Sequence, residues 1–219
     1  METIEALLFD ADGTLVDSEE LGLDTLRRQA LRAGAALSEA DIAGLRGQSM
    51  AACLQAVARR RGRPLPADFE ARLREEMAAV FERELRPMPG AAALLAGLVQ
   101  RAVPLCVATN GPRAKVELTL RLTGLAPFVA GRIFCAPEVG AFKPDPELFL
   151  AAAQALGVAP HRCAVVEDSE PGMEAGLRAG MRVFAVRTVQ PMPPALADRI
   201  HQLDRLEDLL DLVPTGTGA

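Results

Sequence analysis

The sequence has no pair of cysteines at a spacing typical of a zinc site or a redox motif. Its four cysteines are far apart, with no Cys-x-x-Cys among them: Cys53, Cys106, Cys135 and Cys163. Cys106 and Cys163 lie inside apolar runs, where a thiol behaves as a small buried hydrophobic group. We therefore expect all four cysteines to be reduced, without metal-ligand pairs.

Signals for membranes, secretion and nucleic acid are also missing. No charge-free apolar run approaches the ~20 residues of a membrane span, and no signal-peptide pattern precedes Ile4. The net charge is −5, whereas nucleic-acid binding needs a concentrated basic face. The densest basic run, residues 59–63, is typical of a solvated helix end. We expect a cytoplasmic protein with neither a membrane nor a nucleic-acid partner.

Short apolar runs alternate with helix-length segments in the second half of the chain. Runs of this length are typical of strands covered on both faces, and they fall at Ile4–Phe9, Val103–Ala108, Cys163–Val166 and Val183–Val186. Proline start signals and glycine stop signals bound the expected helices at 112–124, 145–157 and 171–180, with Asp145 as an N-cap. The alternation predicts an α/β, doubly wound, Rossmann-like parallel sheet.

Residues 19–85 are predicted to be helical throughout, with breaks near 34–38, 47–49 and 62–66. Ser38 and Asp41 resemble a capping box that uses aspartate. The simplest organisation is an all-helical cap domain, residues 17–86, inserted after the first strand of a core domain formed by residues 1–16 and 87–219.

Two aspartates follow the first apolar run directly, in Asp10-Ala11-Asp12-Gly13-Thr14. Residues i and i+2 of a strand point the same way, so Asp10 and Asp12 project together where open α/β sheets bind ligands. Such a pair suits a hard cation such as Mg²⁺, or a nucleophile beside an acid and base. On this segment alone, an Asp-Gly turn with solvated carboxylates is an equally good interpretation.

Two other segments add polar groups suited to phosphate. Thr109 and Asn110 place a hydroxyl and an amide before an expected helix N-terminus, which favours anions. An ordinary threonine cap would look the same. Lys143 is one of only two lysines, beside Lys115, in a chain whose other cations are arginine. A compact ammonium at this position suggests a bridge between an aspartate and a phosphate, and chance placement is the alternative.

Glu167 and Asp168 end another apolar run and add two carboxylates. They would complete a cation site with Asp10 and Asp12. The alternative is capping of the following helix, which is compatible with metal binding.

These features, in the order Asp-x-Asp, Thr, Lys, Glu-Asp, resemble the four motifs of the haloacid dehalogenase superfamily over most of residues 4–186. The helical insertion resembles the superfamily's helical-cap class. The resemblance implies that Asp10 forms an aspartyl-phosphate, that Asp12 is the acid and base, and that Thr109 and Lys143 hold the phosphoryl group. We expect Asn110 to bind phosphate with them. The resemblance also implies a Mg²⁺ site formed by Asp10, the Asp12 carbonyl and Asp168, with Glu167 in support.

Departures from the family's branches narrow the expected activity. The β-phosphoglucomutase branch has a histidine where this chain has Gly22 and a cap arginine where it has Met50. Arg46-Gly47 matches the cap loop that meets the substrate, and residues 17–19 and 110–112 look most like sugar-phosphate phosphatases, including 6-phosphogluconate phosphatases. We therefore expect a Mg²⁺-dependent phosphatase of small phosphorylated metabolites, a monomer or weak homodimer, with Arg46 contacting substrate. A β-phosphoglucomutase-type mutase and a phosphate-receiving signalling domain are the alternatives.

Overall fold

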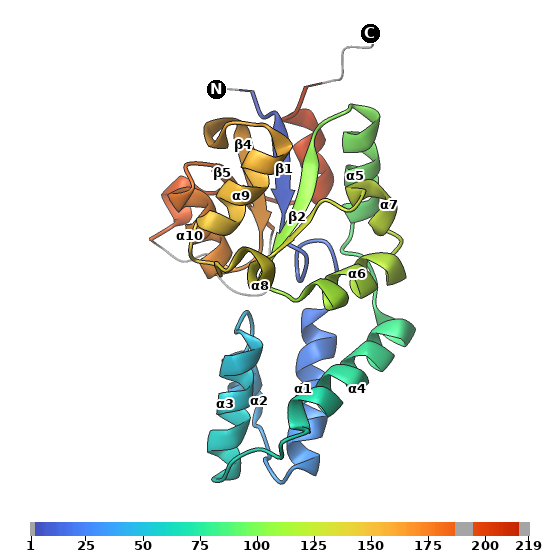
Figure 1. The fold of residues 1–219 in the computed structure, drawn as a ribbon, viewed down its shortest axis with the longest axis vertical. Coiled ribbons are helices and arrows are strands. Elements are labelled where there is room, and N and C mark those ends of the chain that lie inside the picture. The colour runs from blue at the N-terminus through green and yellow to red at the C-terminus, as the bar shows by residue number, and fades with distance from the viewer. Residues whose placement is uncertain (1–2, 187–194, 215–219) are drawn as a thin grey trace. The chain divides into compact units, whose positions relative to one another are not determined.

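The chain divides into two compact units. The computed structural model describes residues 3–186 and 195–214. One unit, here the core unit, comprises Met1–Val16 and Arg86–Ala219, and the other, the helical unit, comprises Asp17–Leu85 (Figure 1). The sequence predicts the second boundary one residue later, after residue 86.

The core unit contains a six-stranded parallel sheet in the order β3-β2-β1-β4-β5-β6. Its strands are β1 (Ala6–Phe9), β2 (Leu105–Thr109), β3 (Ile133–Cys135), β4 (Cys163–Glu167), β5 (Arg182–Val186) and β6 (His201–Leu203). The expected fold class, an α/β parallel sheet with an all-helical insertion, is confirmed. The sequence predicts β1, β2, β4 and β5 but misses β3 and β6, each of which has three residues.

Strand β1 lies at the centre of the sheet. Leu8 pairs with Cys106 of β2 on one side and with Val165 of β4 on the other. All four residues of β1 are fully buried. Because parallel strands end at the same edge of a sheet, the residues that follow β1, β2 and β4 are brought together there.

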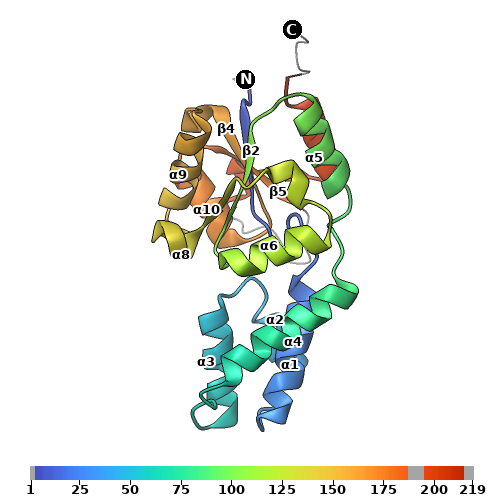
Figure 2. The same cartoon turned by 45° about the vertical axis from the view of Figure 1, so that its right-hand side comes forward.

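Helices cover both faces of the sheet. They are α5 (Ala91–Gln100), α6 (Arg113–Leu122), α7 (Ala126–Val129), α8 (Ala136–Val139), α9 (Glu147–Leu156) and α10 (Glu170–Arg178), with 3₁₀ turns η1 (Pro160–Arg162), η2 (Ala197–Arg199) and η3 (Leu206–Asp211). Helices α9 and α10 lie on one face and α5 on the other (Figures 1 and 2). Asp145 does not occupy the N-cap position, because α9 begins at Glu147 with Pro146 before it; the Asp145 carboxylate instead accepts the Glu147 N–H at 2.9 Å.

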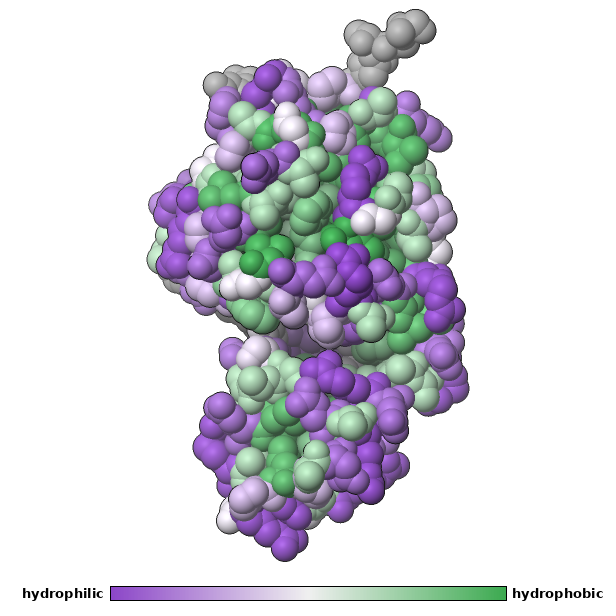
Figure 3. Space-filling view, in the orientation of Figure 1, coloured by the Kyte–Doolittle hydropathy of each residue, from purple (hydrophilic) through white to green (hydrophobic). Residues whose placement is uncertain are grey.

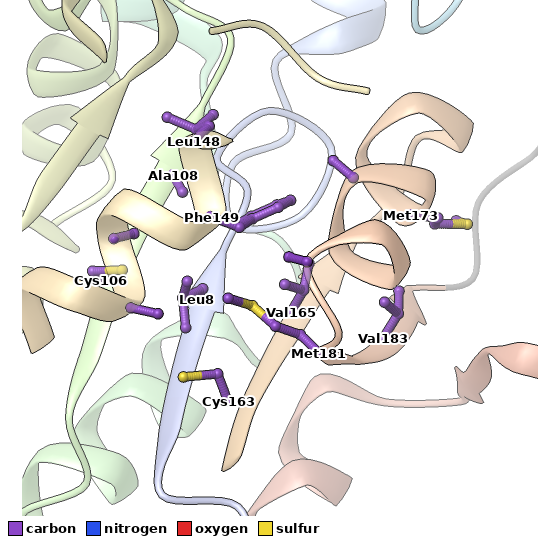
Figure 4. Close-up of a cluster of buried hydrophobic side chains, with 14 of the residues drawn as sticks. Leu8, Cys106, Ala108, Leu148, Phe149, Cys163, Val165, Met173, Met181 and Val183 are labelled. Atoms are coloured by element: carbon purple, nitrogen blue, oxygen red, sulfur yellow. The ribbon is translucent and has the colours of Figure 1, made fainter. Parts of the chain in front are cut away.

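The interior beside α9 and α10 is a continuous hydrophobic cluster. Phe149 of α9 is fully buried and lies near Leu8 and Val165 of the central strands (Figure 4). The cluster also contains Cys106 and Cys163. All four cysteines are buried and free, as expected. Close packing of this cluster gives the strand ends a rigid support.

The helical unit contains α1 (Glu19–Arg32), α2 (Glu39–Ala43), α3 (Met50–Arg61) and α4 (Phe69–Glu84). The breaks between these helices fall where the sequence predicts them. Ser38 and Asp41 form the expected capping box, in which each side chain accepts a backbone N–H of the other residue. Glu76 of α4 lies 2.5 Å from the Arg32 guanidinium of α1, which links the two long helices.

Among the described residues, no helix combines the length and the apolar character that crossing a membrane requires. On the face shown in Figure 3, hydrophilic residues are spread over both units, between smaller hydrophobic areas.

Candidate active site

Asp10 occupies the first position after β1 and is 8% exposed. Its backbone N–H donates to the Val166 carbonyl at 3.0 Å, which extends the β1–β4 pairing to the site. The chain then turns sharply, with Gly13 in the left-handed region at φ +80°. A Cβ on Gly13 would lie 2.0 Å from the Asp168 carboxylate. The turn therefore depends on glycine for both its backbone conformation and its close approach to Asp168.

Lys143 joins two of the carboxylates. Its Nζ lies 2.5 Å from Asp10 Oδ1 and 2.6 Å from Glu167 Oε1, and its side chain is 2% exposed. The ring of Phe149 lies 5.0 Å from the ammonium, so the hydrophobic cluster supports it directly. Two oppositely charged partners and an aromatic ring compensate the cost of burying this cation.

Asn110 holds the loop that carries Lys143. The Lys143 N–H donates to Asn110 Oδ1 at 2.9 Å, and Asn110 Nδ2 donates to the Lys143 carbonyl at 3.5 Å. Thr109 is 2% exposed, and its hydroxyl accepts the Gly111 N–H at 3.1 Å, so it caps the turn before α6. A hydroxyl that accepts a hydrogen bond can still donate one to an anion. The Asn110 side chain is thus a support for Lys143.

Glu167 is fully buried, and both of its oxygens are engaged. Oε1 accepts from Lys143, while Oε2 accepts the N–H groups of Asp168 and Ser169 at 3.0 and 2.9 Å and the Ser169 hydroxyl at 2.9 Å. A Cβ on Gly172 would lie 1.8 Å from Oε1, so α10 approaches this carboxylate closely. Glu167 therefore orients Lys143 and the start of α10.

Burial and neighbouring charges shift the pKa values of Asp10 and Lys143. Burial raises the pKa of Asp10 to about 7, with further increases from Glu167 and Asp12, although Lys143 opposes them. Burial disfavours the Lys143 ammonium, but Asp10 and Glu167 outweigh it and raise the pKa of Lys143 above its ordinary value. The negative charge of Asp10 is thus disfavoured by burial, and additional positive charge near it would stabilise the carboxylate.

The oxygens at the strand ends suit a hard divalent cation. Asp10, Glu167 and Asp168 each offer an oxygen, and these oxygens lie within 4.8 Å of one another. The Thr14 hydroxyl donates to Asp168 Oδ1 at 3.4 Å. An all-carboxylate set of this kind fits Mg²⁺, which prefers oxygen ligands and retains waters that a phosphate can replace.

Asp12 has a cationic partner that the sequence analysis missed. Lys115 of α6 places its Nζ 2.8 Å from Asp12 Oδ2. The side chains are 33% and 28% exposed, so this pair lies closer to solvent than the Asp10–Lys143 pair. The scarcity of lysine, which singles out Lys143, applies equally to Lys115. It was the one feature of the sequence that could have indicated a role for Lys115.

Arg46 belongs to the loop between α2 and α3 of the helical unit. Its Nη2 and Nε lie 2.5 and 2.8 Å from Glu20 Oε1, and Glu19 accepts the neighbouring Gly47 N–H at 2.5 Å. The N-terminus of α1 therefore fixes this loop. Met50 packs against the hydrophobic cluster of the same unit, so it contributes neither a charge nor a polar group.

The model of the haloacid dehalogenase-like hydrolases matches residues 4–180. The chain belongs to this family. The hydrolase is 30% identical over 214 residues to the 6-phosphogluconate phosphatase of Escherichia coli, covering 97% of this chain and 96% of that protein. It is 34% identical over 202 residues to hexitol phosphatase A of the same organism, covering 91% and 88%. The expectation of a phosphatase of this family is confirmed.

A solved structure supports the same assignment. A haloacid dehalogenase family hydrolase from Deinococcus radiodurans, solved with bound phosphate and sodium, is 30% identical and superposes with a TM-score of 0.76. The match covers 96% of this hydrolase and 97% of that chain.

Lys143→Met is expected to lower kcat by about 10²–10³-fold, because it removes a preorganised cation from the site. It leaves Asp10 and Glu167 buried without their shared partner, which is expected to lower the free energy of unfolding by about 3–5 kcal/mol near pH 8. The loss should shrink toward pH 5, because the pKa of Asp10 is raised to about 7 and its protonation removes one of the uncompensated charges. Thermal unfolding at both pH values measures this.

Lys143→Arg is the matched variant. It keeps the positive charge but places a larger planar group in a position that is 2% exposed. We expect a smaller loss of stability than in Lys143→Met, together with strongly reduced kcat. Near-normal kcat in Lys143→Met would contradict the role of the ammonium.

Proposed function

We propose that this hydrolase is a Mg²⁺-dependent phosphomonoester hydrolase that acts on small phosphorylated metabolites through an aspartyl-phosphate on Asp10. The observation that carries the proposal is the buried Asp10 carboxylate, held at 2.5 Å by Lys143, with a second aspartate two residues further on. A carboxylate fixed beside a cation is suited to attack phosphorus while the phosphoryl charge is neutralised.

In the proposed first step, Asp10 attacks phosphorus in line with the leaving alkoxide. The new bond joins phosphorus to a carboxylate oxygen as the ester P–O bond breaks, and Asp12 gives its proton to the leaving oxygen. In the second step, Asp12 takes a proton from the water that attacks the aspartyl-phosphate. This step releases inorganic phosphate and restores both aspartates.

The remaining residues bind and orient the phosphoryl group. Lys143 and the Thr109 hydroxyl contact its oxygens, and the Asn110 side chain keeps Lys143 in place. When bound by Asp10, the Asp12 carbonyl and Asp168, Mg²⁺ would supply further positive charge to the phosphoryl oxygens. We assign Glu167 to the support of this site, because both of its oxygens already have partners.

We propose that residues 17–86 form a cap domain that selects the substrate, and that residues 1–16 and 87–219 form the catalytic core. Sugar phosphates are the proposed substrate class, and 6-phosphogluconate and hexitol phosphates are the first candidates because two relatives carry those names. Arg46 is the proposed cap contact for an anionic or hydroxyl-rich part of the substrate.

A phosphate-release screen tests this function. Sugar phosphates, sugar-acid phosphates, polyol phosphates and nucleotides are incubated with Mg²⁺ and the purified protein. Many turnovers for each protein molecule on at least one sugar phosphate would support the proposal. One equivalent of alcohol per protein molecule, with the phosphoryl group retained on the protein and no free phosphate, would instead indicate a phosphate-receiving signalling domain. Release of neither alcohol nor phosphate from any monoester would overturn the proposal.

β-Glucose 1-phosphate is expected to yield glucose and phosphate, if it reacts, and no glucose 6-phosphate. A mutase must grip a second phosphate, and a dianion desolvated without a cationic partner is costly. Gly22 has no side chain to donate a hydrogen bond, and Met50 is packed in a hydrophobic cluster. A coupled glucose-6-phosphate dehydrogenase assay, primed with glucose 1,6-bisphosphate, checks this. Sustained formation of glucose 6-phosphate in this assay would show that the protein is a mutase.

Arg46→Ala is expected to raise KM about tenfold for sugar-acid phosphates, which corresponds to the loss of one charge-assisted hydrogen bond. The effect on neutral polyol phosphates should be smaller, because they lack the carboxylate. Steady-state kinetics on both substrate types measure the difference. Arg63→Ala, at an exposed arginine of the same unit, is the control and should change neither KM. Equal increases for both substrate types would contradict the assignment.

A further inference from the structure

Both lysines of the chain contact the two aspartates that follow β1. Lysine and arginine together number 24, yet lysine occurs only at positions 115 and 143. Lys143 lies 2.5 Å from Asp10, and Lys115 lies 2.8 Å from Asp12. A compact ammonium is therefore found at each member of the pair, in a chain whose other basic side chains, apart from two histidines, are arginine.

Lys115 extends from a fixed part of the core unit. It lies in the first turn of α6, where its N–H donates to the Pro112 carbonyl at 3.0 Å. Arg113, two residues before it, holds this turn with two bonds of 2.6 Å to Glu138 and one of 2.8 Å to the Ile133 carbonyl. Side chains built on rigid elements position their partners more accurately than side chains on loops.

The preceding turn lies beside the same carboxylate. A Cβ on Gly111 would lie 3.5 Å from the Thr109 hydroxyl and 3.8 Å from Asp12 Oδ2. Asp12 thus has the phosphate-binding turn close to one oxygen and the Lys115 ammonium bonded to that oxygen. The bond from Lys115 therefore favours one orientation of the short Asp12 side chain.

We propose that Lys115 is a positioning residue for Asp12, which holds its carboxylate in the orientation needed for proton transfer. This rests on the proposed function, in which Asp12 protonates the leaving alkoxide and later takes a proton from water. The ammonium also faces the negative charge that develops on Asp12 as its proton leaves. The pair is partly exposed, and exposed ion pairs contribute little to stability. Its contribution is therefore to catalysis and not to folding.

The test compares two substrates that differ in their need for a proton. An alkyl phosphate needs protonation of its leaving oxygen, whereas p-nitrophenyl phosphate has a leaving group that departs without it. The ratio kcat/KM reports the first chemical step, because release of the alcohol is irreversible under initial-rate conditions. For Lys115→Met we expect kcat/KM to fall about 10–100-fold on the alkyl ester, since misplaced catalytic groups cost up to about 10²-fold. On p-nitrophenyl phosphate we expect a fall of less than about threefold.

Three variants make the test specific. Lys115→Arg should recover most of the lost rate on the alkyl ester, because it keeps a cation on the same helix. Arg121→Met removes an exposed cation from the last turn of α6 and should change nothing. In an Asp12→Asn background, Lys115→Met should have no further effect on the alkyl ester, because the residue through which it acts is gone.

The outcomes separate this proposal from the proposed function. A wild-type protein that hydrolyses neither ester overturns both. If the wild type is active, an equal loss on the two esters in Lys115→Met overturns the positioning role alone. An increase in KM confined to substrates that carry an additional anionic group would also overturn it, because Lys115 would then be a substrate contact. So would a lowered melting temperature that accounts for the loss of activity.

Discussion

Asp10→Asn is expected to reduce phosphate release by about 10⁴-fold or more while leaving the fold intact. The amide has the shape of the carboxylate but is a poor nucleophile, and its oxygen can still accept a hydrogen bond from Lys143. Phosphate release on the best substrate of the screen and circular dichroism measure the two halves of the prediction. Asp198→Asn, at an exposed aspartate of the core unit, is the control and should keep full activity.

The same variant tests the electrostatics of the site. Burial raises the pKa of Asp10 from 3.8 to about 7. The folded protein therefore holds this proton more tightly than the unfolded chain, and stability is lost as pH rises from about 4 to about 7. In chelated protein, Asp10→Asn should melt at a higher temperature than the wild type above pH 7, with a difference that disappears toward pH 4. A variant that is less stable throughout this range would show that the Lys143 pair outweighs burial.

Removal of divalent cations is expected to abolish activity. EDTA should reduce phosphate release by more than about 100-fold, because several kcal/mol of charge stabilisation are lost, and added Mg²⁺ should restore it. Ca²⁺ should bind and inhibit, because it takes more ligands than Mg²⁺ and holds them at longer distances. Ca²⁺–oxygen distances are about 2.3–2.6 Å, whereas Mg²⁺ demands about 2.0–2.1 Å. Full activity in thoroughly chelated protein would contradict the assignment.

A binding measurement separates the cation from the chemistry. Mg²⁺ should raise the melting temperature of the wild-type protein, because a ligand that binds only the folded state stabilises it. Asp168→Asn should reduce this shift, whereas Asp198→Asn should leave it unchanged. Loss of the shift in Asp168→Asn with retained Mg²⁺-dependent activity would show that Asp168 lies outside the catalytic metal site.

The sequence predicts the elements that are long and strongly patterned. Strands β1 and β4 read as unbroken apolar runs because both faces of the sheet are covered, and glycines end α9 and α10 where expected. Strand β6 is different. Its residues His201 and Gln202 are exposed, so no apolar run marks the edge of the sheet. Strand β3 was missed for another reason: Ile133–Cys135 is apolar and largely buried, but three residues are too few to form a recognisable strand pattern.

At the site, the sequence predicts which residues gather but not how they bond. Asp10, Glu167 and Asp168 come together because they lie at the ends of the neighbouring strands β1 and β4: Glu167 ends β4, and Asp10 and Asp168 each follow a strand directly. The bonds of Asn110 to the Lys143 backbone, and of Lys115 to Asp12, join residues far apart in the chain. No local pattern encodes the reach of a long side chain across such a separation, so these contacts required the structure.

The central position of β1 has a consequence for how the protein is made. Leu8 is synthesised early, but its partners in the sheet, Cys106 and Val165, emerge much later. At 5–20 residues per second, β1 waits roughly 5–20 s for its first neighbouring strand. The helical unit, encoded between β1 and β2, is complete before that pairing begins. Lys143 and Glu167 are synthesised later still, so the buried environment of Asp10 forms only after most of the chain has been made.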